Sequence, residues 1–238
     1  MMKLLSRAAA VLAIMAMAAC DDLPTGPAPD RAPLPGIDVS HWQGAIDWDA
    51  VADDGVVFAF IKATEGGDYT DPRFAANWAA ARQAGIVRGA YHFFRPQTDA
   101  AAQAAHFLRT VPLAEGDLPP VLDVEVTDGR SAEAIAAGVR TWVQAVEAAT
   151  GRRPIIYTRA SFWTARMDSF GAYPLWVAHY GAAEPNIPAG WSGWTFWQHT
   201  DAGRMAGIAA DVDLDWFNGD RGDLEAFVGS GAIPAAAR

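Results

Sequence analysis

Several features that would assign this chain to a common class of protein are missing from its 238 residues. Cys20 is its single cysteine, which excludes an internal disulfide bond. Lysine and arginine total 18 against 28 acidic residues, with no basic run, so we expect no nucleic-acid partner. The five histidines show neither an H-E-x-x-H pattern nor close pairing, which argues against a zinc site. No G-x-S-x-G, G-x-G-x-x-G or P-loop pattern occurs, and we expect neither serine-hydrolase chemistry nor a cofactor.

The apolar run at residues 8–17 is too short to span a bilayer and follows a basic N-terminus, as in an export signal. Residues 17–20, Met-Ala-Ala-Cys, resemble a bacterial lipobox, in which the cysteine becomes the lipid-bearing first residue of the mature protein. Residues 16–18, Ala-Met-Ala, would instead serve as an A-x-A cleavage site that releases a soluble protein. In either case we expect an exported protein, with membrane contact only through a lipid on Cys20.

Composition divides the chain into four parts. Residues 1–20 form the signal, and residues 21–35 are a proline-rich linker that would act as an extended tether. Residues 36–229 are predicted to form one catalytic barrel domain, followed by a C-terminal tail at residues 230–238. No internal repeat is evident, and we expect a monomer.

Short apolar runs alternate with alanine-rich helical segments, which predicts an α/β domain of parallel strands and crossover helices. About eight strands in one domain favour a modified TIM-like barrel, with a doubly wound open sheet as the alternative. After Leu175 the runs follow one another too closely for regular crossover helices. The predicted strands are 36–39, 57–63, 87–93, 120–125, 154–158, 175–179, 195–199 and 212–217, and the predicted helices are 72–84, 100–109 and 132–149.

The segment Val121–Glu125 places two carboxylates two positions apart. Alternate side chains of a strand point to the same side, so Asp123 and Glu125 should share one face. Like charges without partners are costly on a buried strand, unless a site needs one carboxyl protonated and another ionised. Glycoside cleavage has this requirement. Two solvated acids at a strand end are the alternative interpretation of an isolated D-x-E pattern.

Acids and aromatic residues recur at the ends of the other predicted strands, where a parallel barrel places its active site. Aromatic rings stack on the apolar faces of sugars, and carboxylates and amides bind sugar hydroxyls. Any one of these residues could be a core or turn residue, so their coincidence supports the prediction. The acids are Asp38, Glu65, Asp213 and Asp215, and the other candidates are Tyr91, Tyr157, Trp176, Tyr180, Trp197 and Gln198.

A series of short motifs also runs through the domain in order. They are Gly36–Ser40 (GIDVS), Gln43-Gly44, Ile46–Trp48 (IDW), Phe60–Gly66 (FIKATEG), Gly89–Phe93 (GAYHF), Leu122–Glu125 (LDVE), Ile156–Thr158 (IYT), Leu175-Trp176, Trp197-Gln198 and Val212–Leu214 (VDL). Together they closely resemble the glycoside hydrolase family 25 lysozymes of the Chalaropsis type, from about Gly36 to Gly219. The family has a modified barrel in which plain strands follow the β/α units.

The resemblance implies a muramidase, which cleaves the β-1,4 bond between N-acetylmuramic acid and N-acetylglucosamine in peptidoglycan with net retention. It makes Glu125 the general acid and Asp123 its ionised partner, with Asp38 and Asp213 completing an acidic cluster. The nucleophile is either a carboxylate, Asp123 or Asp213, or the substrate's own 2-acetamido oxygen. Lys62 would pair with the cluster or form a structural salt bridge. The predicted sugar contacts are Glu65, Tyr91, Tyr157, Trp176, Tyr180, Trp197 and Gln198.

Two other functions remain as alternatives to a peptidoglycan muramidase. One is a hydrolase of another N-acetyl glycan, such as chitin, on the same fold. The other is a catalytically silent barrel that binds peptidoglycan. The presence of all four acids speaks against the silent barrel, because a binding module needs aromatic residues more than a carboxylate cluster.

Overall fold

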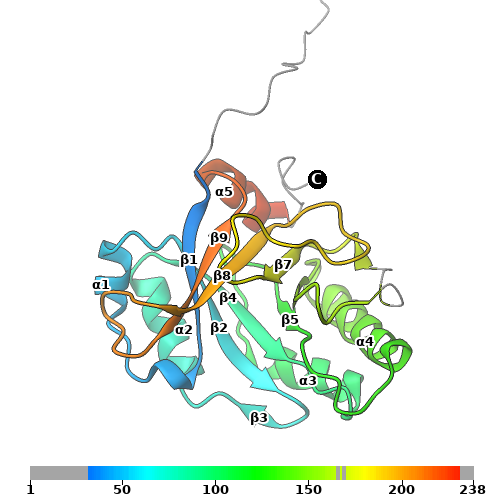
Figure 1. Ribbon diagram of the computed structural model, residues 1–238. Helices are drawn as coiled ribbons and strands as arrows, with labels where there is room; N and C mark the ends of the chain where they lie inside the picture. The colour runs from blue at the N-terminus through cyan, green and yellow to red at the C-terminus, as the bar shows by residue number, and fades with distance from the viewer. Residues whose placement is uncertain (1–31, 165–166, 168–169, 231–238) are drawn as a thin grey trace, which may run out of the picture.

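The computed structural model describes residues 32–164, 167 and 170–230, which form a closed eight-stranded barrel (Figure 1). The strands are β1 Leu34–Val39, β2 Phe58–Glu65, β3 Tyr69–Thr70, β4 Val87–Phe93, β5 Val121–Asp123, β6 Ile155–Thr158, β7 Leu175–Ala178, β8 Phe196–Gly203 and β9 Val212–Phe217. Their order is β1-β9-β8-β7-β6-β5-β4-β2, and β2 pairs again with β1 to close the ring. The short strand β3 pairs with the end of β2. The predicted modified barrel is confirmed.

Strand β9 departs from the parallel arrangement that the alternating sequence pattern predicts. Its neighbours β8 and β1 both pair with it antiparallel, whereas the pairings from β1 through β2, β4, β5, β6 and β7 to β8 are parallel. The physical reason is the short connection from β8 to β9, which allows a hairpin but no crossover. The N-terminal end of β9 therefore lies at the mouth where the parallel strands end, and Asp213 is the cross-strand partner of Asp38.

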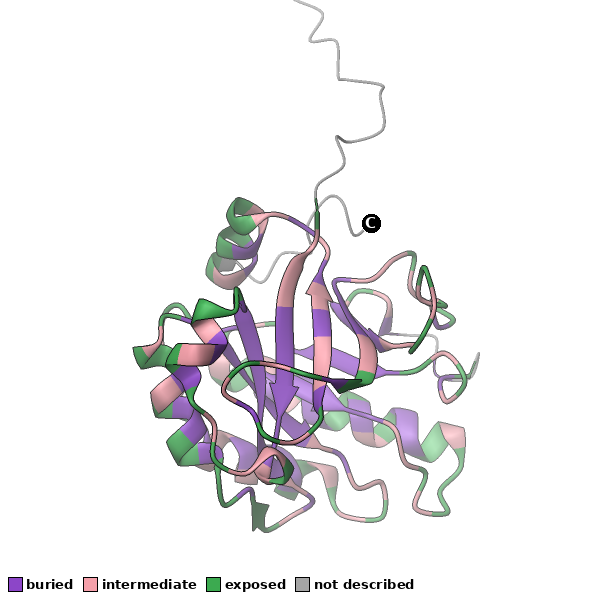
Figure 2. Cartoon of the chain, turned by 60° about the vertical axis from the view of Figure 1, so that its left-hand side comes forward, coloured by how far each residue is buried: buried purple, intermediate pink, exposed green. Residues whose placement is uncertain are grey.

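Four helices connect the first parallel strands and cover the outside of the barrel (Figure 1). They are α1 Trp48–Asp53, α2 Phe74–Gln83, α3 Ala100–Thr110 and α4 Ala132–Thr150. Helix α4 begins after Ser131, whose side chain caps the backbone N–H of Ala134 as the sequence predicts, and ends at Gly151 with φ of 68°. Its buried side chains recur with helical spacing and join the apolar layer between the helices and the strands (Figure 2).

Aromatic side chains fill the half of the barrel interior next to α5, Arg221–Ser230, and leave the mouth open. The ring of Phe60 stacks on Trp176 with centroids 4.3 Å apart, and both are fully buried. Helix α5 closes the end opposite the mouth by packing Leu224 and Phe227 against this cluster. Gly89 gives Phe60 its space, because a Cβ there would lie 2.7 Å from the ring. Because the half next to α5 is packed, a cavity inside the barrel can form only in the half where the parallel strands end.

The predicted elements agree with the structure, with differences at their ends. The strands at residues 87–93 and 212–217 are confirmed with the predicted bounds, and β8 continues four residues beyond its predicted end. Helices α1 and α5 were not predicted: α1 has only six residues, whereas α5 has ten, the same length as the predicted α2. The signal with Cys20, linker residues 21–31 and residues 231–238 lie outside the described residues, and β1 begins at Leu34, two residues before the predicted start of the barrel domain. Among the described helices, none combines the length and the apolar character needed to cross a bilayer.

Candidate active site

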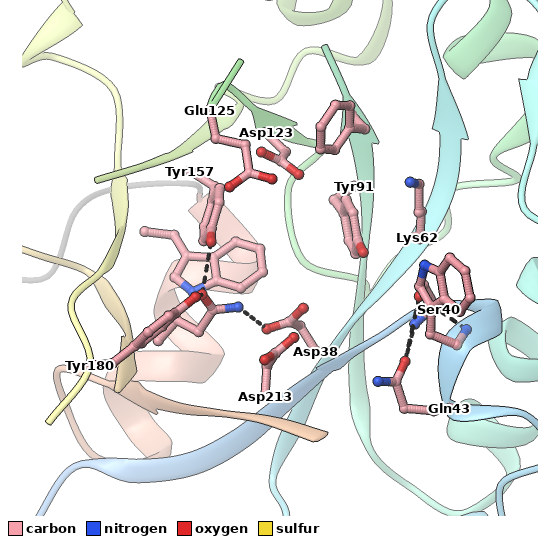
Figure 3. Close-up of a pocket in the computed structure, with 14 residues that line it drawn as sticks. Asp38, Ser40, Gln43, Lys62, Tyr91, Asp123, Glu125, Tyr157, Tyr180 and Asp213 are labelled. Carbon is pink, nitrogen blue, oxygen red and sulfur yellow. Dashed lines mark hydrogen bonds between the residues drawn. The ribbon is translucent and has the colours of Figure 1, made fainter. Parts of the chain in front are cut away.

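A cavity of about 250 Å³ opens at the mouth of the barrel, where the parallel strands end (Figure 3). The four predicted catalytic acids all line it, and so do five of the seven predicted sugar contacts. The lining residues are Asp38, Ser40, Trp42, Gln43, Lys62, Tyr91, Phe93, Asp123, Glu125, Tyr157, Trp176, Tyr180, Gln198 and Asp213. Side chains from distant parts of the chain therefore converge on one cavity.

Asp123 and Glu125 face this cavity from the end of β5 (Figure 3). Beyond Asp123 the chain keeps its strand direction, because the N–H of Val124 donates to the carbonyl of Tyr157 at 2.9 Å. The Thr158 hydroxyl also donates to the Val124 carbonyl, at 2.8 Å. Val124 consequently points into the outer core, fully buried, and the two carboxylates on either side of it point inward. The alternation predicted for the D-x-E pattern is confirmed.

The two carboxyls of this pair are electrostatically linked. Burial raises the pKa of Asp123 well above its ordinary value, and the neighbouring charge of Glu125 raises it further. Burial also raises the pKa of Glu125, while the positive charges of Arg159 and Lys62 oppose the increase. Oδ1 of Asp123 is buried without a hydrogen-bond partner among the described residues. Such a pair favours the state in which two carboxyls share a single proton.

Asp38 and Asp213 form the opposite wall, where Gln198 orients Asp38 (Figure 3). The carbonyl oxygen of Gln198 accepts hydrogen bonds from the hydroxyls of Tyr157 at 2.8 Å and Tyr180 at 2.7 Å. These two bonds fix the side-chain amide so that its NH₂ group donates to Asp38. Burial raises the pKa of Asp38 well above its ordinary value, and the charge of Asp213 raises it further. This wall therefore presents a carboxyl and an amide in fixed positions.

Asp215 lies deeper on β9 and does not line the cavity. Its Oδ1 accepts a hydrogen bond from Trp176 Nε1 at 2.8 Å, and the residue is 1% exposed. Burial raises its pKa well above the ordinary value, with a further contribution from Asp213. The sequence placed Asp215 beside Asp213 at a strand end, but the antiparallel direction of β9 carries it away from the mouth. Its contact with Trp176 fixes the indole that forms the cavity floor.

Two predicted sugar contacts are placed outside the cavity lining. The carboxylate of Glu65 binds Lys62 Nζ at 2.7 Å and Arg95 Nη1 at 3.4 Å. Lys62 itself lines the cavity, so the salt bridge that the sequence suggested holds a cation beside the acids. Trp197 is buried, and its Nε1 donates to the carbonyl of His179 at 2.8 Å. Sugar contact by Glu65 and Trp197 remains a prediction.

The loop after β1 supplies cavity residues that the sequence analysis did not identify. Ser40 and Gln43 form a reciprocal capping box around the short 3-10 helix η1, His41–Gln43. Between them Trp42 is 77% exposed while lining the cavity. An exposed tryptophan at a cavity rim is a platform for the apolar face of a sugar. The loop follows Asp38 at a predicted strand end, and this position in the sequence could have identified it as part of the site.

Asp213 should make the folded protein more stable at acidic pH. Burial raises its pKa from 3.8 to about 6, so within this interval the folded state binds more protons than the unfolded state. The stabilisation that Asp213 gains from binding a proton in the folded state is fully present below pH 3.8 and is lost as the pH rises through about 6. We expect the free energy of unfolding to fall across this range, and to fall less in Asp213→Asn. Urea unfolding at a series of pH values tests this, and equal slopes for both proteins would contradict it.

Comparison with known proteins agrees with the motifs. The family model described as glycosyl hydrolases family 25 matches residues 37–208. Lysozyme M1 of Streptomyces globisporus is 42% identical over 226 residues, covering 89% of this chain and 76% of the relative. The protein YegX of Escherichia coli K12 is 47% identical over 199 residues, covering 81% and 72%. The crystal structure of the bacterial lysozyme from Streptomyces coelicolor superimposes with a TM-score of 0.81 at 40% identity, covering 85% of this chain and 100% of that one. The chain belongs to family 25 of the glycosyl hydrolases.

Proposed function

We propose that this protein is a muramidase, which hydrolyses the β-1,4 bond between N-acetylmuramic acid and N-acetylglucosamine in peptidoglycan. The main support is that the pairs Asp123–Glu125 and Asp38–Asp213 line a single cavity in a family 25 chain. Glycoside cleavage needs such carboxyls, because one must give a proton while another stabilises positive charge on the sugar. The names of the similar proteins from Streptomyces, both lysozymes, agree with this activity.

Glu125 is the proton donor in this proposal. It is the less buried carboxyl of its pair, so it is the more accessible to a glycosidic oxygen that enters from the mouth. The raised pKa values of both carboxyls keep one proton on the pair before the reaction, and Glu125 is the member placed to deliver it. The positive charges of Arg159 and Lys62 limit that increase, which leaves the carboxyl acidic enough to release the proton as the bond breaks.

Asp123 acts in its ionised form beside the reacting carbon. It either attacks that carbon, or it holds and polarises the 2-acetamido group whose oxygen attacks, and both routes retain the anomeric configuration. The unpartnered Oδ1 is available to accept the acetamido N–H. Water then completes hydrolysis, with Glu125 taking back a proton as a general base.

The remaining cavity residues bind the sugar. Asp38, Asp213 and Gln198 offer oxygen and amide groups to ring hydroxyls on the wall opposite Glu125. Tyr180 is 44% exposed and lies across the cavity from the Ser40 and Gln43 loop that carries Trp42 (Figure 3). These two exposed aromatic residues suit neighbouring sugars of a glycan strand that crosses the mouth.

The site of action is the cell envelope. The composition of residues 1–20 supports export, and Cys20 supports attachment by a lipid. The proline-rich residues 21–35 would hold the barrel away from the membrane, where glycan strands can reach its mouth. We therefore propose an exported enzyme, anchored through Cys20, whose macromolecular substrate is peptidoglycan.

Release of soluble dye from labelled, purified cell walls tests this function. We expect release by the wild-type protein from cell walls, and little release from equally labelled chitin. Binding to the walls without release would favour the silent barrel. Equal release from chitin would favour a hydrolase of another N-acetyl glycan.

A further inference from the structure

A second cavity, of about 260 Å³, adjoins the catalytic cavity on the side of β6 and β7. Tyr157 and Tyr180 line both cavities, so they lie where the two adjoin. Both tyrosine hydroxyls donate to Gln198, so both residues are held in place by the same bonds that orient Asp38. Because the two cavities share these residues, the second cavity is the nearest space for a substituent of a sugar that is bound in the catalytic cavity.

The second cavity has the opposite electrostatic character to the first. Arg159, which directly follows β6, lines it, and no carboxylate lines it among the residues that the structure describes. The side chain of Arg159 is exposed, and its guanidinium makes no hydrogen bond or ion pair with any residue that the structure describes. In contrast, the catalytic cavity is lined by four acids. A guanidinium that lines a cavity and has no partner in the protein can donate hydrogen bonds to an anionic group of a ligand.

Further hydrogen-bond donors lie around this guanidinium. Nδ1 of His179 accepts the backbone N–H of Asn186 at 3.0 Å, so in the neutral ring the proton is on Nε2. His179 therefore offers an N–H, and Ser161, which also lines the cavity, offers a hydroxyl. Arginine, histidine and serine together match a carboxylate, which only accepts hydrogen bonds.

Muramic acid differs from glucosamine by a lactyl group at O3, and this branch carries carboxylates. In peptide-free glycan it ends in its own carboxylate, and in intact peptidoglycan it continues into a peptide with carboxylates of its own. We propose that the Arg159 cavity binds a carboxylate on the lactyl branch of the muramic acid whose ring occupies the catalytic cavity. This inference rests on the proposed muramidase function and assigns the feature by which the enzyme distinguishes muramic acid from glucosamine.

Two matched pairs of substrates test the proposal and separate the two sources of the carboxylate. The first pair is peptide-free glycan and the same glycan with its lactyl carboxyls converted to neutral methylamides. The second pair is peptide-bearing, uncross-linked glycan before and after its peptide carboxyls are converted to neutral methylamides. We expect the wild type to favour the charged member of at least one pair by about tenfold in kcat/KM, as one hydrogen bond to a charged group supplies. The pair that shows the preference identifies the carboxylate.

Arg159→Gln should abolish this preference, and Arg159→Lys should keep part of it. Arg159 also lowers the pKa of Glu125, so its removal changes the rate of cleavage by a second route. That change is the same for both substrates of a pair, and the ratio of their kcat/KM values therefore isolates the contact with the carboxylate. Arg82→Gln is the matched control, since it removes an exposed arginine from α2 on the outside of the barrel and should keep the preference. An equal loss by Arg159→Gln on charged and neutral glycan would overturn the proposal, and so would a wild type without preference.

Calorimetric binding of charged and neutral fragments from both pairs to Glu125→Gln gives a readout that needs no turnover. We expect about tenfold tighter binding of the preferred charged fragment, lost when Arg159→Gln is added. If the wild type cleaved none of the glycans, the muramidase function would fail while this measurement would still decide the role of the second cavity. Equal affinities for charged and neutral fragments of both pairs would contradict it.

Discussion

Glu125→Gln should lower turnover of peptidoglycan by at least ~100-fold, the smaller end of the range for loss of a general acid. The amide keeps the size and hydrogen-bonding shape of the side chain but has no proton to give to the glycosidic oxygen. Because Glu125 is only partly buried and makes no hydrogen bond that holds the fold, the variant should unfold at nearly the same temperature as the wild type. Rates of muropeptide release at saturating substrate, together with thermal unfolding, measure both effects.

Glu225→Gln is the matched control for this substitution. Glu225 is exposed on α5, at the end of the barrel opposite the cavity, and the change removes the same charge (Figure 1). We expect turnover within a factor of about two of the wild type, as for a surface change away from the site. Near-normal turnover by a folded Glu125→Gln protein would remove Glu125 from the role of acid.

Asp123→Asn is the second substitution with a large expected effect, a fall in turnover of about 100- to 1000-fold, as for loss of one group that stabilises transition-state charge. Asp123 is buried at the cavity wall, and its charge is the one closest in sequence to the acid. Whether it attacks the sugar or polarises the acetamido group, asparagine cannot supply the negative charge. Asp53→Asn, an exposed residue at the end of α1, serves as its control.

The pH dependence of Asp123→Asn gives a signature that a general structural defect would not produce. The charge of Glu125 raises the pKa of Asp123, and because repulsion between two charges is mutual, an ionised Asp123 also opposes the ionisation of Glu125. Removing that charge lowers the pKa of the acid, and the alkaline limb of the residual activity should shift to lower pH. An unchanged alkaline limb would contradict the electrostatic link between the two carboxyls.

The two routes for Asp123 differ in whether a covalent intermediate forms on the protein. A substrate with a good leaving group, incubated with Glu125→Gln, would accumulate a glycosyl ester on Asp123 if that carboxylate attacks directly. The assisted route leaves the protein mass unchanged, because the intermediate is an oxazolinium ion within the sugar. Intact-protein mass spectrometry distinguishes the two outcomes.

The main features of the site could be predicted from sequence because strand geometry is simple. Side chains alternate along a strand, so the spacing of Asp123 and Glu125 was enough to place both in the cavity. Parallel strands of a barrel end at one mouth, so strand-end residues such as Asp38 and Tyr157 were brought together as predicted. Asp213 was placed correctly for a different reason, since it begins β9 and does not end it.

Other features depend on tertiary packing that no local pattern contains. Trp197 lies next to Gln198 in the sequence, but alternation along β8 turns it outward to His179 while Gln198 turns to the cavity. Glu65 has the residue type expected of a sugar contact, yet two cations hold its carboxylate outside the lining. Arg159 also follows a strand end, but only the structure shows that it lines the second cavity, where we propose that it binds a carboxylate.

The reducing ends that appear when the protein digests purified peptidoglycan show which bond the acids around this cavity cleave. We expect cleavage on the reducing side of N-acetylmuramic acid. After borohydride reduction and mass spectrometry, we expect products that end in reduced muramic acid, formed by the wild type and lost in Glu125→Gln. Products that end in reduced glucosamine, or no new reducing ends at all, would contradict this expectation.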